Sequence, residues 1–156
     1  MGPTPVTTAE EMRAYVDDAL HQRLKGVSMP FVIVHQASDE IIGSTRYASI
    51  EPLDRRLEIG WTWVASGHQR SGANTEAKLL LLMHAFETLG AMRVEFKTDS
   101  LNAKSRAAIA RIGATEEGTF RNHMITYSGR IRHTVYFSII DAEWPGVKAR
   151  LKGMFR

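Results

Sequence analysis

Residues 57–90 read LEIGWTWVASGHQRSGANTEAKLLLLMHAFETLG, and this stretch determines the fold that the sequence predicts. It begins with a strand at 57–65, in which we expect Ile59, Trp61 and Trp63 to alternate on one face. A polar loop follows, and then a long, mostly buried helix at 75–90. Because another strand comes next, at 92–99, the segment predicts a strand–helix–strand unit with parallel strands and a right-handed crossover.

The flanking segments add antiparallel strands and further helices. The predicted elements are a helix at 8–25 with a Thr8–Glu11 capping box, strands at 30–35 and 41–50 that form a hairpin, a short helix between residues 102 and 113, and a last strand pair at 115–126 and 131–140. The fold class is therefore α/β (α+β), with a mixed, mostly antiparallel twisted sheet flanked by helices.

Composition narrows the possible functions. The chain has 156 residues, of which 44% are hydrophobic and 24% charged, so we expect one globular domain over 1–156, with residues 1–7 flexible. It has no cysteine, which excludes disulfides, thiolate metal sites and a cysteine acyl-enzyme. No apolar run is long enough to cross a membrane. The net charge of +3 does not call for a nucleic acid partner, and we expect a cytoplasmic protein.

The loop GHQRSGANTEAK at 67–78 allows two interpretations. The start of a helix leaves backbone N–H groups without partners, Gly72 lets the main chain approach a ligand closely, and Arg70 supplies positive charge, so the loop suits a phosphorylated ligand. Alternatively, Asn74 or Thr75 only caps the helix and nothing binds. The residues of the loop alone do not decide between the two.

Several motifs in a fixed order resemble the GCN5-related N-acetyltransferase (GNAT) superfamily, and more narrowly its RimJ/RimL-type branch. They are IGWTWVA at 59–65, the Gln69-x-x-Gly72-x-Asn74 loop before a helix, DSLNAKSRAAIARIGA at 99–114 and VYFSIIDAEWP at 135–145. These motifs lie within residues 30–145, and the family match as a whole extends over about residues 8–145.

The resemblance implies that acetyl-CoA is the acyl donor, that an amine is the acceptor, and that no metal takes part. The implied coenzyme-binding residues lie at the end of the third strand, in the loop and at the start of the short helix: Trp63, Val64, Ala65, Gln69, Arg70, Ser71, Gly72, Ala73, Asn74, Thr75, Asn102 and Ser105. The chain departs from the family pattern at Asn74, where Gly or Ala is usual, so the mouth of the loop should be narrower.

Three residues are candidates for catalysis. Ser105 occupies a position where family members place a hydroxyl near the thioester sulfur, although it also suits a helix cap. Glu58 lies where many acetyltransferases keep a carboxylate base, and its alternative is an ordinary surface residue. His123 is a second candidate base, because histidine is the common side chain for proton transfer at physiological pH, although Met124 holds the position at which an acid is expected. A water relay without a dedicated base is a further alternative. With no cysteine, the sequence favours direct attack by the amine in a ternary complex over a covalent intermediate.

Other functions stay open. The chain also suits a coenzyme A-binding module without activity, or a degenerate partner subunit, and a purely structural domain is a third possibility. Family members usually carry a further strand and helix before the segment matched by residues 8–25, whereas only seven residues precede Thr8 here. We therefore expect the usual first strand to be truncated, missing or supplied by a partner chain. The resulting sheet edge predicts a homodimer that exchanges a strand. The sequence does not identify the amine acceptor, which ranges from a protein N-terminus to a small molecule.

Overall fold

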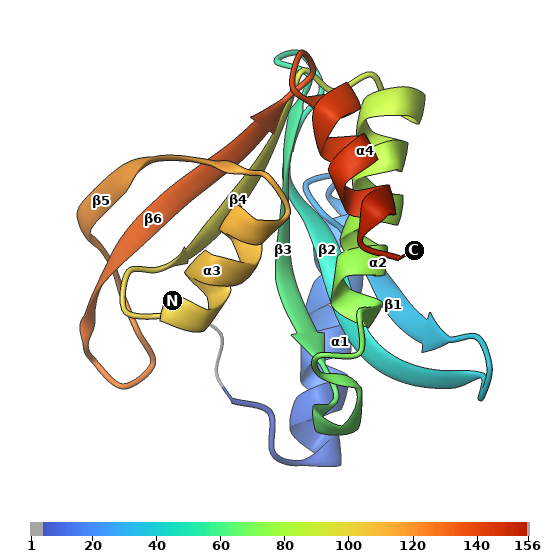
Figure 1. The fold of residues 1–156 in the computed structure, drawn as a ribbon. Helices are drawn as coiled ribbons and strands as arrows, with labels where there is room; N and C mark the ends of the chain where they lie inside the picture. The colour runs from blue at the N-terminus through green and yellow to red at the C-terminus, as the bar shows by residue number, and fades with distance from the viewer. Residues whose placement is uncertain (1–4, 156) are drawn as a thin grey trace.

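The structure is a computed structural model that describes residues 5–155, so part of the segment expected to be flexible lies outside the described residues. Six strands form one sheet in the order β1-β2-β3-β4-β6-β5, and helices pack on it (Figure 1). The strands are β1 (Met29–His35), β2 (Glu40–Glu51), β3 (Arg56–Val64), β4 (Arg93–Asp99), β5 (Thr115–Ile125) and β6 (Ile131–Ile140). The helices are α1 (Ala9–Leu24), α2 (Ala73–Met83), α3 (Ala103–Arg111) and α4 (Trp144–Gly153), with short turns η1 (Ser66–His68) and η2 (His84–Thr88).

The crossover from β3 through α2 to β4 positions the site. β3 and β4 are paired in parallel, as the sequence predicts, but only over Arg56–Arg93, Leu57–Val94 and Glu58–Glu95. Beyond these pairs β4 continues along β6, while β3 continues along β2. The two strands therefore separate in the middle of the sheet, as Figure 1 shows. Past Glu58, one edge of β3 has no neighbouring strand.

Helices cover the two faces of the sheet unequally. The Tyr47 hydroxyl donates a hydrogen bond to the Leu81 carbonyl in α2 at 2.5 Å, so odd-numbered residues in this part of β2 face α2. The next side chain back, Arg46, points to the other face and reaches Asp18 of α1. α4 lies beside α2 (Figure 1). The apolar core lies between the sheet and the α2 face, where Phe96, Phe137, Leu82, Ile139 and Leu151 are almost fully buried.

The start of α2 differs from the prediction. The helix begins at Ala73, two residues earlier than expected, and Gly72 is its N-cap with a left-handed φ of 86°. No side chain caps it, so the interpretation of Asn74 or Thr75 as a cap is wrong. The helix also ends earlier, at Met83, and one π-helical turn follows. The apolar run around His84 predicts a core histidine, but the structure places His84 in that turn with its side chain exposed, so this prediction is wrong.

A β-bulge changes the faces of β3. The register with β2 shifts between Arg46 and Ser44, and Trp61 in the shifted segment has φ of 55°. Ile59 remains buried in the core, but Trp61 packs against the Arg46 guanidinium on the α1 face, with 4.8 Å between Cζ and the ring centroid. The predicted alternation of Ile59, Trp61 and Trp63 on one face is therefore wrong, because the bulge inserts an extra residue.

The first helix follows its prediction closely. The Thr8 hydroxyl accepts a hydrogen bond from the Glu11 amide at 3.1 Å, and the Glu11 carboxylate accepts one from the Thr8 amide at 2.9 Å. This confirms the capping box. No helix within residues 5–155 is both long and apolar enough to span a membrane.

Candidate active site

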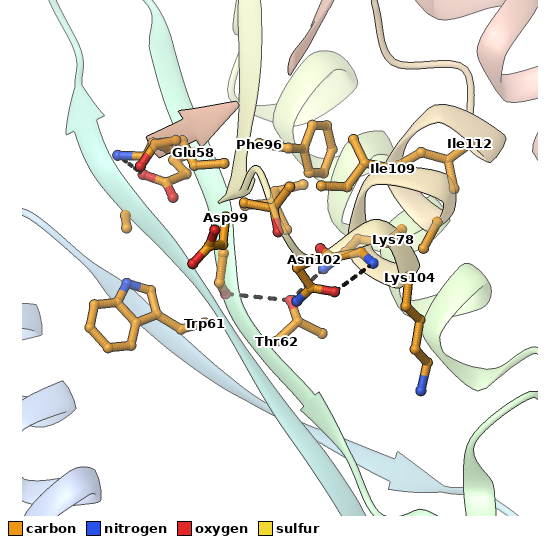
Figure 2. Close-up of a pocket in the computed structure, with 18 of the residues that line it drawn as sticks. Glu58, Trp61, Thr62, Lys78, Phe96, Asp99, Asn102, Lys104, Ile109 and Ile112 are labelled. Atoms are coloured by element: carbon orange, nitrogen blue, oxygen red, sulfur yellow. Dashed lines mark hydrogen bonds and ion pairs between the residues drawn. The ribbon is translucent and has the colours of Figure 1, made fainter. Parts of the chain in front are cut away.

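A cavity of about 640 Å³ opens where β3 and β4 separate (Figure 2). This volume lies in the range of small-molecule sites. Its walls come from both faces of the sheet: α2 and α3 on one side, and the outward side chains of β3 and β4 on the other. The lining residues include Ser49, Glu58, Trp61, Thr62, Asn74, Thr75, Lys78, Phe96, Lys97, Asp99, Asn102, Lys104, Ser105, Arg111, His123, Met124 and Arg132.

The N-terminus of α2 presents unpaired polar groups at this cavity. The Glu76 amide donates to the Gly72 carbonyl at 3.0 Å. The amides of Asn74 and Thr75 come earlier in the helix, where no preceding turn supplies a carbonyl partner. A helix start of this kind favours an anion. The Asn74 side-chain oxygen is buried and has no hydrogen-bond partner within residues 5–155. The site therefore provides amides for a phosphate and an acceptor for an N–H or O–H group of the same ligand.

The start of α3 lies on the same side of the cavity. Asn102 is the N-cap, and its side-chain oxygen accepts a hydrogen bond from the Ser105 amide at 3.0 Å. Both residues also line the cavity, so capping and ligand contact are compatible here. The Arg111 guanidinium donates to the Thr75 hydroxyl and joins α3 to α2. α2 and α3 therefore form one wall.

The loop between β3 and α2 contains the short turn η1 and is also held by side-chain hydrogen bonds. The Gln69 side chain donates to the Val64 carbonyl at 3.1 Å and accepts from Lys104 of α3 at 3.1 Å. The Ser71 hydroxyl donates to the His68 carbonyl at 2.5 Å. The sequence candidates that lie along this loop and strand end, outside the cavity lining, are Trp63, Val64, Ala65, Gln69, Arg70, Ser71, Gly72 and Ala73.

Glu58 lies on the opposite face of the sheet from α2. It is buried and ion-paired with Lys97 of β4 at 2.7 Å, which rules out the surface alternative. Burial disfavours the ammonium of Lys97, but the hydrogen bond and negative charge of Glu58 outweigh burial and raise the pKa of Lys97. A Cβ at Gly60 would lie 2.8 Å from the Glu58 carboxylate, so glycine at this position leaves room for that side chain.

His123 enters the cavity from β5. Its Nδ1 lies 3.0 Å from the Thr134 hydroxyl, and its ring packs edge-on against Tyr136. Met124, the next residue, also lines the cavity. Neighbouring strand residues ordinarily face opposite ways, but the β5–β6 register shifts between Phe120 and Met124. The structure therefore brings Glu58, His123 and Ser105 to one cavity.

Lys97, Lys104 and Arg111 line the cavity without having been predicted from the sequence, and so does Lys78. It projects from α2, is only 7% exposed and lines the cavity. Its ammonium donates to the Thr62 hydroxyl at 2.5 Å, and that hydroxyl lies 2.9 Å from the hydroxyl of Thr45. Burial lowers the pKa of Lys78 to about 7. The available signal was a lysine in an apolar run, four residues before the fully buried Leu82 and therefore on the same helix face.

The charges around the cavity favour an anionic ligand. The lining includes the cations Lys97, Lys104, Arg111 and Arg132, together with Lys78, which is about half protonated near pH 7, but only the carboxylates Glu58 and Asp99. Both carboxylates are paired, Glu58 with Lys97 and Asp99 with Arg130. No group of His, Asp or Glu within the described residues has the arrangement of a metal site. The free amides of α2, the unpartnered Asn74 oxygen and the excess positive charge therefore fit the phosphates and the amide-bearing arm of coenzyme A.

Comparison with known proteins identifies the family. The model of the acetyltransferase (GNAT) domain matches residues 1–115. YdaF of Bacillus subtilis (strain 168), named as a candidate ribosomal N-acetyltransferase, is 34% identical over 69% of this chain, and the match spans 58% of YdaF.

Solved structures agree with this match. A GCN5-related N-acetyltransferase from Brucella melitensis superposes with a TM-score of 0.89 and 32% identity over 97% of this chain and 66% of that protein. RimJ of Mycobacterium smegmatis, in complex with CoA-disulfide, gives a TM-score of 0.80 and 26% identity over 94% of this chain and 69% of that one. The chain belongs to the GNAT acetyltransferase family, in its RimJ/RimL-type branch.

Proposed function

We propose that this chain, as a single domain, transfers the acetyl group of acetyl-CoA to a primary amine by direct attack in a ternary complex. The observation that carries the proposal is the cavity itself. It joins the two faces of the sheet at the only parallel strand pair of the described residues, with the anion-binding end of α2 on one face and Glu58 on the other. Two substrates that enter from opposite faces would meet there.

The coenzyme side would use the residues named from the family pattern. The amides at the start of α2, with Gly72 leaving the main chain accessible, would hold the pyrophosphate, and Lys104 and Arg111 would add positive charge. The unpaired edge of β3 from Trp63 to Ala65 would receive the pantetheine arm. Asn102 and Ser105 would contact the same arm near the thioester. RimJ of M. smegmatis, the relative solved with a coenzyme A derivative, supports this choice of ligand.

The acceptor side would supply the base. An alkyl ammonium must lose a proton before its nitrogen attacks the thioester. Glu58 would accept that proton, directly or through water. Its carboxylate would then be neutral, so the ion pair with Lys97 would be lost. His123 is the alternative base on the other wall. A backbone N–H of β3 beyond the split would stabilise the oxyanion, since no neighbouring strand covers that edge.

Two measurements test the proposal. Calorimetry with acetyl-CoA should detect binding, and its absence would exclude both catalysis and a coenzyme-binding role. A thiol-release assay then compares N-terminal peptides with small primary amines as acceptors. Because the chain contains no cysteine, every thiol detected comes from the coenzyme. Binding without thiol release for any acceptor, in the wild type as in Ser105→Ala, would favour the alternative of a non-catalytic coenzyme A-binding module.

We also propose the homodimer that the sequence predicts. β1 forms one edge of the sheet, and Val32 on it is 60% exposed. An apolar edge strand of this kind tends to pair with another chain. Light scattering at high micromolar concentration should give the mass of a dimer, and a monomeric mass would contradict the proposal.

A further inference from the structure

Lys78 has features that its place in the fold does not explain. It is buried in the core-facing helix α2, yet none of the ion pairs formed by residues 5–155 involves it. Its ammonium has three hydrogens, and the only bond it makes within those residues is to the Thr62 hydroxyl. A buried amine without a carboxylate partner is costly. A methionine would fill the same space without that cost.

The position of Lys78 indicates what its amine faces. Asn74, Thr75 and Lys78 line the same cavity, and one helical turn separates the first two from Lys78. Thr62 lies on β3 four residues past Glu58, the last residue paired with β4, in the part of the strand whose edge is open. Lys78 therefore lies one turn further along α2 than the helix start, and its amine reaches the strand whose open edge would receive the coenzyme arm. Figure 2 shows it among the residues around the cavity, near Asn102 and Thr62.

Resting on the acetyl transfer proposed above, we propose that Lys78 is a further catalytic residue, whose ammonium contacts the coenzyme sulfur and protonates it as it leaves. The acceptor nitrogen forms the C–N bond while the C–S bond breaks, and the electron pair of that bond goes to sulfur. Lys78 gives its proton to the sulfur and becomes a neutral amine. The proton that the acceptor nitrogen loses goes to the base on the acceptor side. Lys78 takes up a new proton from water after coenzyme A has left.

The electrostatics of the cavity agree with this role. Burial brings the pKa of Lys78 to about 7, below the value of about 8.5 that is ordinary for an alkyl thiol, so the transfer of the proton to sulfur is downhill. The contact is favourable in both protonation states, because an ammonium donates to a thiolate and a neutral amine accepts from a thiol. The other titratable groups that line the cavity are Glu58, Lys97, Asp99, Lys104, Arg111, His123 and Arg132.

Binding measurements without turnover test the contact. Coenzyme A and desulfo-coenzyme A, which carries hydrogen in place of the thiol, are titrated into the wild type and Lys78→Met by calorimetry. We expect the preference of the wild type for coenzyme A over the desulfo compound to be at least about tenfold. In Lys78→Met that preference should fall about tenfold, while the affinity for the desulfo compound changes little. The two proteins and the two ligands form a double-mutant cycle, which isolates the interaction between Lys78 and the sulfur from the contacts made by the rest of the coenzyme.

Matched variants distinguish a contact between Lys78 and the sulfur from a general effect of positive charge and from a folding defect. Lys104→Met removes the same charge from the cavity, but its amine points to Gln69 at 3.1 Å, so it should weaken both ligands equally. Lys78→Gln provides a second variant with a polar group for Thr62 and should behave like Lys78→Met. In the thiol-release assay, Lys78→Met should lower kcat about 100-fold.

The outcomes are distinct. If neither coenzyme A nor its desulfo form binds the wild type, the proposed function fails, and this inference fails with it. If both bind the wild type equally well, or if Lys78→Met keeps the wild-type preference, Lys78 does not contact the sulfur, and only the inference is overturned. Unchanged kcat in Lys78→Met would overturn the catalytic role in the same way.

Discussion

Replacing Lys78 by methionine should stabilise the protein at neutral pH, and the gain should shrink as the pH rises. In the unfolded chain an ordinary lysine titrates near 10.5, whereas burial brings the pKa of Lys78 to about 7 in the folded protein. Each tenfold change in proton affinity corresponds to about 1.4 kcal/mol. Folding with the protonated amine buried therefore costs on the order of 5 kcal/mol, part of which the bond to Thr62 offsets.

The sign of the pH effect follows from where the proton is held. Below pH 7 both the folded and the unfolded chain hold the proton of Lys78, and the full cost applies. Between about pH 7 and 10.5 the unfolded chain holds it and the folded chain does not, so the stability of the wild type rises with pH. Above that range both states are neutral and no electrostatic cost remains. Methionine has no such dependence.

The expected difference is large enough to measure. From pH 7 to pH 9, the stability advantage of Lys78→Met over the wild type should narrow by about 2 kcal/mol. For a chain of this length that corresponds to roughly 4–8 °C in the difference between the two melting temperatures. Urea denaturation of both proteins at several pH values in that range provides the free energies. Other titrating groups are common to both proteins and cancel in the comparison.

A control on the same helix makes the test specific. Leu82→Met also changes a buried side chain of α2 but introduces or removes no titratable group. Its stability difference from the wild type should be the same at every pH. If the curves for Lys78→Met and the wild type also run parallel, Lys78 titrates alike in the folded and unfolded chains. That result would refute the lowered pKa and the description of Lys78 as a buried amine.

Three further substitutions test other parts of the structure. Gly72→Val places a β-branched residue at a φ of 86°, so it should lower the free energy of unfolding by about 1–2 kcal/mol in thermal denaturation. It should also weaken acetyl-CoA binding at least about tenfold by calorimetry. Unchanged affinity would show that the loop is not the coenzyme site. Gly43→Ala would bring a Cβ into the Trp63 carbonyl oxygen and so displace the end of β3. The free energy of unfolding in urea should fall by about 1–3 kcal/mol, and coenzyme affinity should fall as well. Thr8→Ala removes the oxygen that accepts from the Glu11 amide at 3.1 Å, and it should cost about 1 kcal/mol in unfolding. Acetyl-CoA affinity should be unaltered, because Thr8 bonds to Glu11 in the same helix start and does not line the cavity.

The elements could be predicted from sequence because their signals are local. Alternation, helical spacing and the Thr8–Glu11 capping box depend on residues within a few positions, and the structure confirms the capping box and the order of the predicted helices and strands. Helix α4 (Trp144–Gly153) was not predicted. The bulge at Trp61 could not be predicted in this way, because it results from the pairing of β3 with β2 rather than from the residues of β3 alone. The same limit explains the start of α2, where Gly72 takes a left-handed conformation and neither Asn74 nor Thr75 serves as the cap.

The candidate site depends even more on pairing. Glu58 lies in a strand whose sequence alone is also consistent with a surface residue, but the structure shows it buried and ion-paired with Lys97, 39 positions later in the chain. His123 and Met124 both line the cavity only because the β5–β6 register shifts. The prediction of a coenzyme-binding loop came from the family resemblance, which rests on the order of the motifs along the chain. It carried no information about how the two walls of the cavity meet.

Lys78 shows why a buried charge is more informative in a structure than in a sequence. In the run AKLLLL a lysine is compatible with a helix face that turns to solvent, and its spacing to Leu82 indicates only that it shares the buried face. A long side chain can follow an apolar surface and place its amine in water. The structure excludes that outcome, since the amine ends at Thr62 beside the open edge of β3. A fold that keeps an amine there, at a cost that methionine would avoid, is better explained by the reaction than by packing.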